Sequence, residues 1–387
     1  MNRFLREKRI ICLMKGKDYK PLSWFGKVVL VVNLFFVAAL LLAYMATYID
    51  PVSFSYLPFF GLFYPVSLFS NLFFVVFWLL GRRKYFLISF VVILIGFSHL
   101  SHFVQFSFIS HGIESKEKEL NVMSFNVRLF DLYNWTQNKY TRNEIFKFLE
   151  EEDPDIICFQ EFYHQHPSRP WNFPTRDTLT KILQAKYYAE GYTVNVSHSQ
   201  FFGLATFSKY PIVNSGHLRF ENDHNNSFLF SDIKVDEDTI RVYNAHIGSA
   251  RFSQADYGAI GTEGNFKTWP HQETNENSQI VARLANAYVK RSIQTQQLLS
   301  HSTQSPFPVI IGGDFNDTPV SYNYNCLTQH YIDAFTQSAN GTGGTYCPIP
   351  LLRIDYILHS DFFNSFGFTT HQQKLSDHKA ISTTIEF

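Results

Sequence analysis

The stretch Val309-Ile-Ile-Gly-Gly-Asp-Phe-Asn316 decides the fold of this 387-residue chain. Its apolar part, Pro308–Ile311, has the composition of a short buried strand, and the two glycines that follow allow a tight turn. Asp314 and Asn316 come directly after the glycines. Taken alone, Asp-Phe-Asn indicates a turn, because Asp and Asn side chains hydrogen-bond their own backbone. The stretch becomes informative only if other strands end in the same way.

Other apolar strands do end in, or carry, polar residues that can perform chemistry. They are Asn126 after Asn121–Phe125, Glu161 after Asp155–Gln160, Asn244 and His246 at the end of Ile240–His246, Asp355 within Arg353–Ile357, and Asp377 and His378 after Lys374–Ser376. Most of them have a structural explanation when taken singly, such as a turn, a surface pair or a solvated carboxylate. Asp355 is harder to explain in that way, because a carboxylate inside an apolar strand needs a buried partner. Strands place such residues at one edge of a rigid sheet, so we expect them to form one site.

The segment from Leu120 to Phe387 mixes strand and helix patterns. Strands are expected over Leu120–Val127, Asp155–Gln160, Ala205–Ser208, Thr239–His246, Pro308–Ile311 and Ile354–Leu358, and helices over Arg142–Glu152 and Ser278–Ser300. Long loops that serve a site or are partly disordered are expected over His164–Thr178, Gly216–Ser227 and Gly248–Asn277. The mixture predicts an α+β fold made of packed layers.

The order of the strand-end residues along the chain gives a specific resemblance. The blocks that carry it are Ser124-Phe-Asn-Val-Arg128, Ile157-Cys-Phe-Gln-Glu161, Gly203-Leu-Ala-Thr-Phe-Ser-Lys-Tyr-Pro-Ile212, Val242-Tyr-Asn-Ala-His246, Gly312-Gly-Asp-Phe-Asn316, Arg353-Ile-Asp-Tyr-Ile357 and Ser376-Asp-His378. In this order they resemble the endonuclease/exonuclease/phosphatase superfamily, which includes pancreatic-type deoxyribonuclease, abasic-site endonuclease, neutral sphingomyelinase and inositol polyphosphate phosphatases. The resemblance covers Leu120–Phe387 and implies an α+β fold, a four-layer sandwich of two mixed β-sheets flanked by helices. It implies the reaction class and says little about the substrate.

The resemblance also implies a divalent metal and an activated water. Mg²⁺ or Mn²⁺ is expected to bind mainly through Glu161, helped by Asn126 and Asp377, since hard oxygen ligands suit these ions. Asp314 is expected to align or deprotonate the attacking water. Asn316 is expected to orient that water or the phosphate.

Two histidines and two further polar residues complete the site that the resemblance implies. His378, paired with Asp355, is expected to be an imidazolium over the phosphoryl oxygens, and His246 a phosphate ligand or the acid for the leaving group. Asn244 and Arg128 are expected to bind substrate. Arg128 has a second interpretation, as a residue that caps a strand at the surface. No matched position carries an inert residue, so we expect an active hydrolase.

The N-terminal part has the pattern of a membrane segment. Three apolar runs follow one another, Val28–Tyr48, Pro58–Leu80 and Tyr85–Ile109, and each exceeds the roughly 20 residues that cross a bilayer core. Polar residues between His99 and Gln105 interrupt the third run, so its alternative is a helix that lies in the membrane interface. We expect a cytoplasmic basic leader (1–27), three transmembrane helices (28–110), a linker (111–119) and a catalytic domain (120–387).

Charge is distributed unevenly between these parts. Residues 1–111 contain 11 Lys/Arg and three acids, a net charge of +8, whereas residues 112–387 contain 22 Lys/Arg and 30 acids, a net charge of −8. Basic residues fill the leader and the Arg82–Lys84 turn, while the Ile49–Leu57 link has none. The positive-inside rule then places the N-terminus in the cytoplasm. With three crossings, the catalytic domain lies on the outer face of a cell membrane, periplasmic or extracellular.

The acidic balance of the catalytic part argues against nucleic acid as the first choice of substrate, because phosphate backbones are usually met by basic surfaces. The expected function is a membrane-tethered, Mg²⁺-dependent phosphodiesterase or phosphatase that acts on a phospholipid head group or a soluble phosphoester. Two alternatives stay open. One is an extracytoplasmic nuclease acting on DNA or RNA, and the other is a non-catalytic binding module on the same fold.

Overall fold

The computed structural model describes residues 21–81, 83–105, 118–166, 173–221, 223, 225–249 and 277–387. The chain divides into two compact units, of which the first contains residues 1–41 and 65–94 and the second residues 42–64 and 95–387. Residues 1–20 of the expected leader, Arg82 and residues 111–117 of the expected linker lie outside the described residues.

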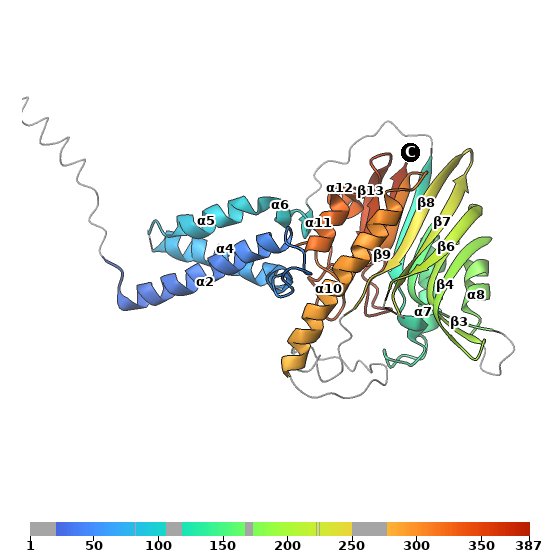
Figure 1. Ribbon diagram of the computed structural model, residues 1–387, viewed down its shortest axis with the longest axis horizontal. Coiled ribbons are helices and arrows are strands. Elements are labelled where there is room, and N and C mark those ends of the chain that lie inside the picture. Colours follow the sequence, from blue (N-terminus) through green and yellow to red (C-terminus); the bar gives the residue numbers. More distant parts are fainter. Residues whose placement is uncertain are drawn as a thin grey trace, which may run out of the picture. The chain divides into compact units, whose positions relative to one another are not determined.

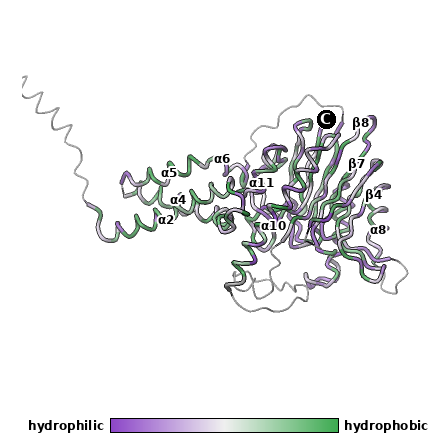
Figure 2. Tube along the Cα trace, in the orientation of Figure 1, coloured by the Kyte–Doolittle hydropathy of each residue, from purple (hydrophilic) through white to green (hydrophobic). Residues whose placement is uncertain are grey.

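The first unit is built from the greater part of three apolar helices. They are α2 (Trp24–Ala46), α4 (Tyr64–Leu80) and α5 (Phe86–Ile95), and Figure 2 shows their hydrophobic character. Among the described residues, α2 is the one helix that is long and apolar enough to cross a membrane. The other two are apolar but shorter, so three full crossings stay a prediction.

Buried polar side chains tie these helices together. Asn33 Nδ2 donates to Ser89 Oγ at 2.7 Å, and Trp78 Nε1 donates to Asn33 Oδ1 at 2.9 Å. Asn71 Nδ2 donates to the backbone oxygen of Phe36 at 2.9 Å. Side-chain hydrogen bonds between apolar helices favour their association, because the alternative is an unsatisfied polar group in apolar surroundings. The three helices of the first unit are therefore held by specific contacts.

The second and third apolar runs are more broken than the sequence suggests. The second run contains α3 (Pro58–Leu62) followed by α4, and the third contains α5, α6 (Phe97–Leu100) and the short strand β1 (Val104–Gln105). Gly96 separates α5 from α6, and a Cβ there would lie 1.9 Å from the Tyr44 ring. Close packing at this glycine, and strand pairing after it, end the helix before the run ends.

The second unit contains two six-stranded sheets, with strand orders β13-β14-β2-β3-β5-β4 and β10-β12-β9-β8-β7-β6. The strands are β2 (Glu119–Asn126), β3 (Ile156–Gln165), β4 (Tyr187–Val196), β5 (Gln200–Ser208), β6 (Ile212–Arg219), β7 (Ser227–Val235), β8 (Asp238–His246), β9 (Val309–Asp314), β10 (Ile332–Asp333), β12 (Asp355–His359), β13 (Asn364–Thr370) and β14 (Ile381–Glu386). Each sheet is mixed, because β2 runs parallel to β3 and β8 runs parallel to β9 while the other pairs are antiparallel. A separate ladder joins β1 to β11 (Gly341–Thr342).

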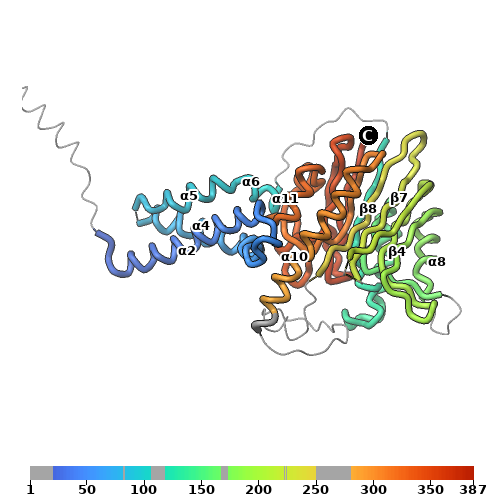
Figure 3. Tube along the Cα trace, viewed as in Figure 1, coloured from blue at the N-terminus to red at the C-terminus, as the bar shows by residue number. Residues whose placement is uncertain are grey.

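Helices cover the outer faces of both sheets (Figure 1). They are η1 (Arg128–Asp131), α7 (Thr141–Glu152), α8 (Thr175–Ile182), α10 (Asn277–Ser302) and α11 (Tyr322–Thr328). α12 (Ala334–Ser338) instead buries Ala334 and Phe335 in the core between the two sheets. In Figure 3, α10 and α11 lie side by side, although a strand separates them in the sequence.

Alternation along the strands assigns side chains to separate apolar cores. Val122 of β2 and Val242 of β8 point into the core between the two sheets. Met123, one position on, belongs to the core under α7 and α8, and Tyr243 belongs to the core under α10 and α11. Since each strand turns alternate side chains to opposite faces, one sheet can line two cores. The resulting order of helices, sheet, sheet and helices confirms the expected α+β sandwich of two mixed sheets flanked by helices.

One expected loop is partly strand. β6 extends to Arg219 and β7 begins at Ser227, and these two residues pair with each other, so the segment 216–227 contains a hairpin. β6 is the edge strand of its sheet, and most of its side chains are exposed or half-buried. A strand with little buried surface carries polar residues on both faces, and this hides the alternation that identifies strands in a sequence.

Candidate active site

Asp314 lies in the centre of a row of three residues on neighbouring strands. It is the last residue of β9, and its register partners are His246, the last residue of β8, and Asp355, the first residue of β12. Directly opposed residues on adjacent strands project to the same face of a sheet. Three residues that are far apart in the sequence are thus brought together by strand register alone.

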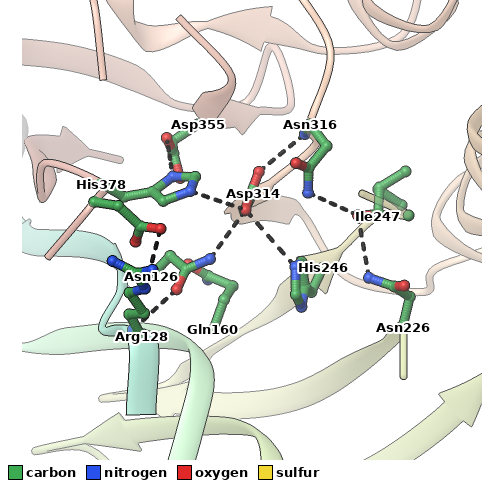
Figure 4. Close-up of polar contacts among 12 residues, drawn as sticks. Asn126, Arg128, Gln160, Asn226, His246, Ile247, Asp314, Asn316, Asp355 and His378 are labelled. Atoms are coloured by element: carbon green, nitrogen blue, oxygen red, sulfur yellow. Dashed lines mark hydrogen bonds and ion pairs between the residues drawn. The ribbon is translucent and has the colours of Figure 1, made fainter. Parts of the chain in front are cut away.

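The carboxylate of Asp314 is buried and surrounded by polar groups (Figure 4). Its Oδ2 accepts a hydrogen bond from Asn126 Nδ2 at 3.0 Å and lies 3.7 Å from His246 Nε2 and 3.6 Å from His378 Nε2. Its Oδ1 accepts from the backbone N–H of Asn316 at 2.9 Å. Burial raises the pKa of Asp314 above its ordinary value, although the nearby histidines and Asn126 oppose that shift.

His378 forms a buried pair with Asp355. The Nδ1 atom of His378 lies 3.0 Å from Asp355 Oδ2, so an Nδ1–H donates to this carboxylate. Burial alone would lower the pKa of His378, but the charges of Asp355 and Asp314 outweigh it and hold the pKa well above 6.5. The imidazole is therefore protonated near neutral pH, with its Nε2–H directed toward Asp314. The expected partnership of Asp355 with His378 is present.

Glu161 reaches the site from an irregularity in β3. The pairing of β3 with β5 shifts between Phe159 and Phe162, where β3 has one residue more than its partner, and Glu161 has a positive φ of 49°. Such a β-bulge re-aims a side chain, and a left-handed conformation of a residue other than glycine is strained and frequent at functional sites. The bulge leaves the neighbouring Gln160 fully buried and Glu161 partly exposed.

Burial and, after it, neighbouring charges set the pKa of Glu161. Burial and the negative charges of Asp377 and Asp314 raise the pKa of Glu161 to about 7, against the opposing positive charges of His378 and Arg128. Burial and like charges disfavour the ionised form of a carboxylate, and a nearby cation favours it. A cation bound beside Glu161 would therefore stabilise its charged form.

Arg128 is held by a left-handed turn that follows Asn126. The four residues of η1, Arg128–Asp131, all have φ between 43° and 55°. Arg128 Nε lies 3.3 Å from Asp377 Oδ2, and its guanidinium carbon lies 4.6 Å from the centre of the Trp135 ring. Left-handed residues cost about 1–2 kcal/mol each, so buried neighbours must hold the turn in place. Two of its own side chains do so, because Leu129 and Phe130 are buried.

Asn244 lies beneath the site, and its side chain is fully bonded. Its Nδ2 donates to the backbone oxygens of Phe159 and Ala205, each at 3.0 Å, and its Oδ1 accepts from Gln160 Nε2 at 2.8 Å. Asn244 and Gln160 are both 0% exposed. They join β8 to β3 and β5, and therefore link the two sheets directly under the site. The expected contact of Asn244 with substrate stays a prediction.

A second set of residues holds the loop that follows His246. The Ile247 oxygen accepts from Asn316 Nδ2 at 3.0 Å and from Asn226 Nδ2 at 3.2 Å, as Figure 4 shows. The next backbone N–H, of Gly248, donates to Gln294 Oε1 on α10 at 2.7 Å. Asn226 was not anticipated from the sequence, because it lies in a polar segment that lacks strand alternation. Gln160 carried a usable signal, as a polar residue inside an apolar strand.

The residues present fit a divalent cation. Ligand atoms of Asp314, Asp355 and His378 lie within 4.8 Å of one another, but Asp355 and His378 already bind each other. Glu161 and Asp377 are further oxygen donors, and burial together with the charge of Asp377 raises the pKa of Glu161. Carboxylate and amide oxygens are the donors that hard divalent ions prefer.

Comparisons with known proteins identify the family of the chain. The family model for the endonuclease/exonuclease/phosphatase family matches residues 123–378, and a domain of unknown function, DUF8431, matches residues 26–103. A search of curated proteins gives no match.

Solved structures resemble the second unit. An endonuclease/exonuclease/phosphatase from Beutenbergia cavernae is 17% identical, with a TM-score of 0.51 over 70% of this chain and 72% of that chain. One from Bacteroides vulgatus is 14% identical, with a TM-score of 0.49 over 70% of this chain and all of that chain. The human Nocturnin catalytic domain with bound sulfate is 17% identical, with a TM-score of 0.47 over 71% and 96%. The family match covers well over half of the sequence. The chain therefore belongs to the endonuclease/exonuclease/phosphatase family and is a metal-dependent hydrolase of phosphoester bonds.

Proposed function

We propose that this protein is a membrane-tethered phosphodiesterase or phosphatase that uses Mg²⁺ or Mn²⁺ to hydrolyse a phosphoester by in-line attack of water. The observation that carries the proposal is the position of Asp314. One oxygen of a buried carboxylate lies beside the amide of Asn126 and the imidazoles of His246 and His378. A carboxylate surrounded in this way is arranged to exchange a proton and not only to fill space.

Asp314 is the base in this proposal. Its raised pKa makes it a better proton acceptor than an exposed aspartate. The N–H of Asn316 donates to Oδ1 and the amide of Asn126 donates to Oδ2, so the orientation of the carboxylate is fixed. Each carboxylate oxygen has a second lone pair, and one of these would accept the proton of the attacking water. Removing the proton as the water attacks would make the nucleophile without leaving a hydroxide free in the site.

The two histidines act on the phosphoryl group. Asp355 fixes Nδ1 of His378, so the imidazolium presents its Nε2–H to the site beside Asp314, where it would donate to a phosphoryl oxygen as negative charge develops there. His246 lies across the same carboxylate oxygen and would bind phosphate or protonate the leaving group. Arg128 would meet the phosphate from the side of Asp377, its partner at 3.3 Å.

Glu161, Asn126 and Asp377 would hold the cation. A divalent ion bound there supplies charge neutralisation at the phosphoryl oxygens. These residues contribute oxygen donors, and Glu161 is aimed by the strained bulge of β3. The assignment to Mg²⁺ or Mn²⁺ rests on those oxygen donors, which suit hard ions better than zinc.

A substrate panel tests the proposal. Purified full-length protein with Mg²⁺ is assayed on bis-p-nitrophenyl phosphate, sphingomyelin vesicles and plasmid DNA, each with the Asp314→Asn variant beside it. We expect hydrolysis of the small diester that disappears in EDTA and returns with Mg²⁺ or Mn²⁺. Full activity in EDTA would overturn the metal assignment, and cleavage of plasmid DNA alone would favour a nuclease.

The proposal places the catalytic domain outside the cytoplasm. Its support is the basic leader and the Arg82–Lys84 turn on one side of the apolar runs, against the Ile49–Leu57 link without Lys or Arg on the other. Alkaline phosphatase fused after Glu119, which is active only when exported, should give signal. A cytoplasmic reporter fused at the same residue should not. The opposite pattern would mean that the third run does not cross.

A further inference from the structure

Asp314 is followed by a buried connection, Phe315–Ser321, that leads into α11. Phe315 and Val320 are 2% and 0% exposed, and Asn316 has a positive φ of 52°. Because the proposed base stands at its beginning, the path of this connection sets the position of Asp314 and Asn316. What packs against the connection therefore matters for catalysis.

Gly61 of α3 packs directly against this connection. A Cβ at Gly61 would lie 2.1 Å from the backbone oxygen of Val320, well inside the closest approach of two such atoms. The φ of Gly61 is not positive, so a left-handed backbone is not the reason for glycine here. The glycine is required because α3 and the connection approach so closely, and a backbone oxygen cannot rotate away as a side chain can.

Residues near α3 reach the helix that supports the same connection. Asp50 Oδ1 accepts a hydrogen bond from Ser292 Oγ of α10 at 2.7 Å, and the Phe59 ring lies 5.6 Å from that of Tyr288. The Tyr288 ring in turn lies 4.5 Å from the guanidinium of Arg291. This guanidinium faces the connection, because its Nε lies 3.7 Å from Oδ2 of Asp317, the acidic residue within Phe315–Ser321.

A further contact reaches the site from its other side. β1, which ends the third apolar run, pairs antiparallel with β11. Three residues after β11, Thr345 Oγ1 accepts from the backbone N–H of Asp355 at 3.2 Å. The ring of the adjacent Tyr346 lies 5.2 Å from that of His378. A chain of contacts therefore leads from the β1–β11 pairing, through Thr345 and Tyr346, to the Asp355–His378 pair.

We infer that the segments bordering the apolar helices, Asp50–Tyr64 and Ile95–Gln105, are positioning elements of the active site, and that Gly61 is the residue that fixes the Asp314 connection. This inference rests on the proposed role of Asp314. A displacement of about 1 Å at a catalytic group can cost about a hundredfold in rate. The segments that border the apolar helices would then do more than tether the enzyme, since the catalytic geometry depends on their contacts.

The test compares Gly61→Ala with Gly81→Ala in the full-length protein in detergent. A Cβ at Gly81 would have its nearest neighbour at 3.5 Å, an ordinary contact, so this variant is the matched control. We expect Gly61→Ala to lower kcat on bis-p-nitrophenyl phosphate about ten- to a hundredfold while KM and the Mg²⁺ requirement change little. Equal kcat values for the two variants would overturn the inference.

Hydrogen exchange and the activity of the wild-type protein distinguish a failure of this inference from a failure of the proposed function. Hydrogen exchange of the peptide covering residues 315–321 should be faster in Gly61→Ala than in Gly81→Ala, and equal exchange would count against the inference even if no substrate were found. An inactive wild-type protein would count against the proposed function instead.

A double-mutant cycle covers the case in which Gly61→Ala does not fold. Asp50→Ala and Ser292→Ala should each lower kcat by about two- to tenfold, the range expected for loss of one hydrogen bond. The double variant should be no worse than either single one, because both changes remove the same contact. Additive losses, or none, would show that this contact does not act on the site.

Discussion

His246, Asp314 and Asp355 reach the active site from three neighbouring strands in ordinary register, whereas Glu161 and Arg128 reach it from strained backbone. The first group belongs to the second sheet, where the ladder of hydrogen bonds alone fixes the three positions. The second group belongs to the side of the first sheet, where a bulge and a left-handed turn aim the side chains. The site thus joins a regular half to a strained half.

The difference separates two chemical tasks. The regular half contains the groups proposed to move protons, and proton transfer demands fixed distances between donor and acceptor. The strained half contains Glu161, which lies beside the like-charged Asp377 and Asp314 and is proposed to hold the cation. Strained backbone conformations persist only where many surrounding contacts hold them in place. Changes in the regular half should therefore alter kcat, and changes in the strained half should first alter the metal requirement.

Asp314→Asn should have the largest effect. Loss of the base is expected to lower kcat by about 10²–10⁴ at saturating Mg²⁺, with the fold intact, because Asn keeps the shape of the side chain. Steady-state kinetics and circular dichroism measure the two quantities. Asp361→Asn, at an exposed aspartate after β12, is the control and should behave as wild type. A near-normal kcat in Asp314→Asn would remove this residue from the mechanism.

His378→Ala should come next, with a fall in kcat of about 10²–10³. Adding Asp355→Asn to it should cause little further loss, because the two side chains act as one unit through the Nδ1 hydrogen bond. Comparing the two single variants with the double variant measures this coupling. Fully additive losses would mean that Asp355 acts independently of His378.

Glu161→Gln should act mainly on the metal. We expect the Mg²⁺ concentration for half-maximal activity to rise about ten- to a hundredfold, with part of kcat recovered at high Mg²⁺. Activity titrations with Mg²⁺ and Mn²⁺ check it, with Glu221→Gln, at an exposed turn, as control. If Glu161→Gln left the Mg²⁺ titration unchanged and lowered only kcat, the division of the site into two halves would fail.

The smallest expected effect concerns the stability of the metal-free protein. The pKa of Glu161 is about 7 in the folded state against an ordinary 4.5. Between these pH values the folded chain keeps a proton that the unfolded chain has lost, so this group's contribution to the free energy of unfolding falls as pH rises through that range. Thermal unfolding in EDTA should therefore show a smaller decline from pH 4.5 to pH 7 in Glu161→Gln than in wild type. Identical declines would contradict the raised pKa.

The regular half of the site is also the half that its sequence makes visible. Apolar strands that end in His246 and Asp314 display the alternation and the terminal polar residues that a reader can recognise. The bulge at Glu161 and the left-handed turn at Arg128 depend on tertiary packing, and local sequence does not indicate them. The strand-end pattern identified Glu161, and the family resemblance gave Glu161 and Arg128 their expected roles, but neither indicated the conformation of their backbone. The β1 strand was missed because an apolar run continues through it.

The pairing of β1 with β11 bears on how the protein is made. β1 leaves the ribosome early, whereas β11 emerges only when most of the catalytic domain has been synthesised. Pairing between such distant segments is slow, because the intervening loop must close first. We therefore expect the nascent chain to lack the support of Asp355 until translation is nearly complete. Because Asp355 and His378 themselves follow β11 in the chain, we expect the nascent protein to be inactive until its synthesis is nearly complete.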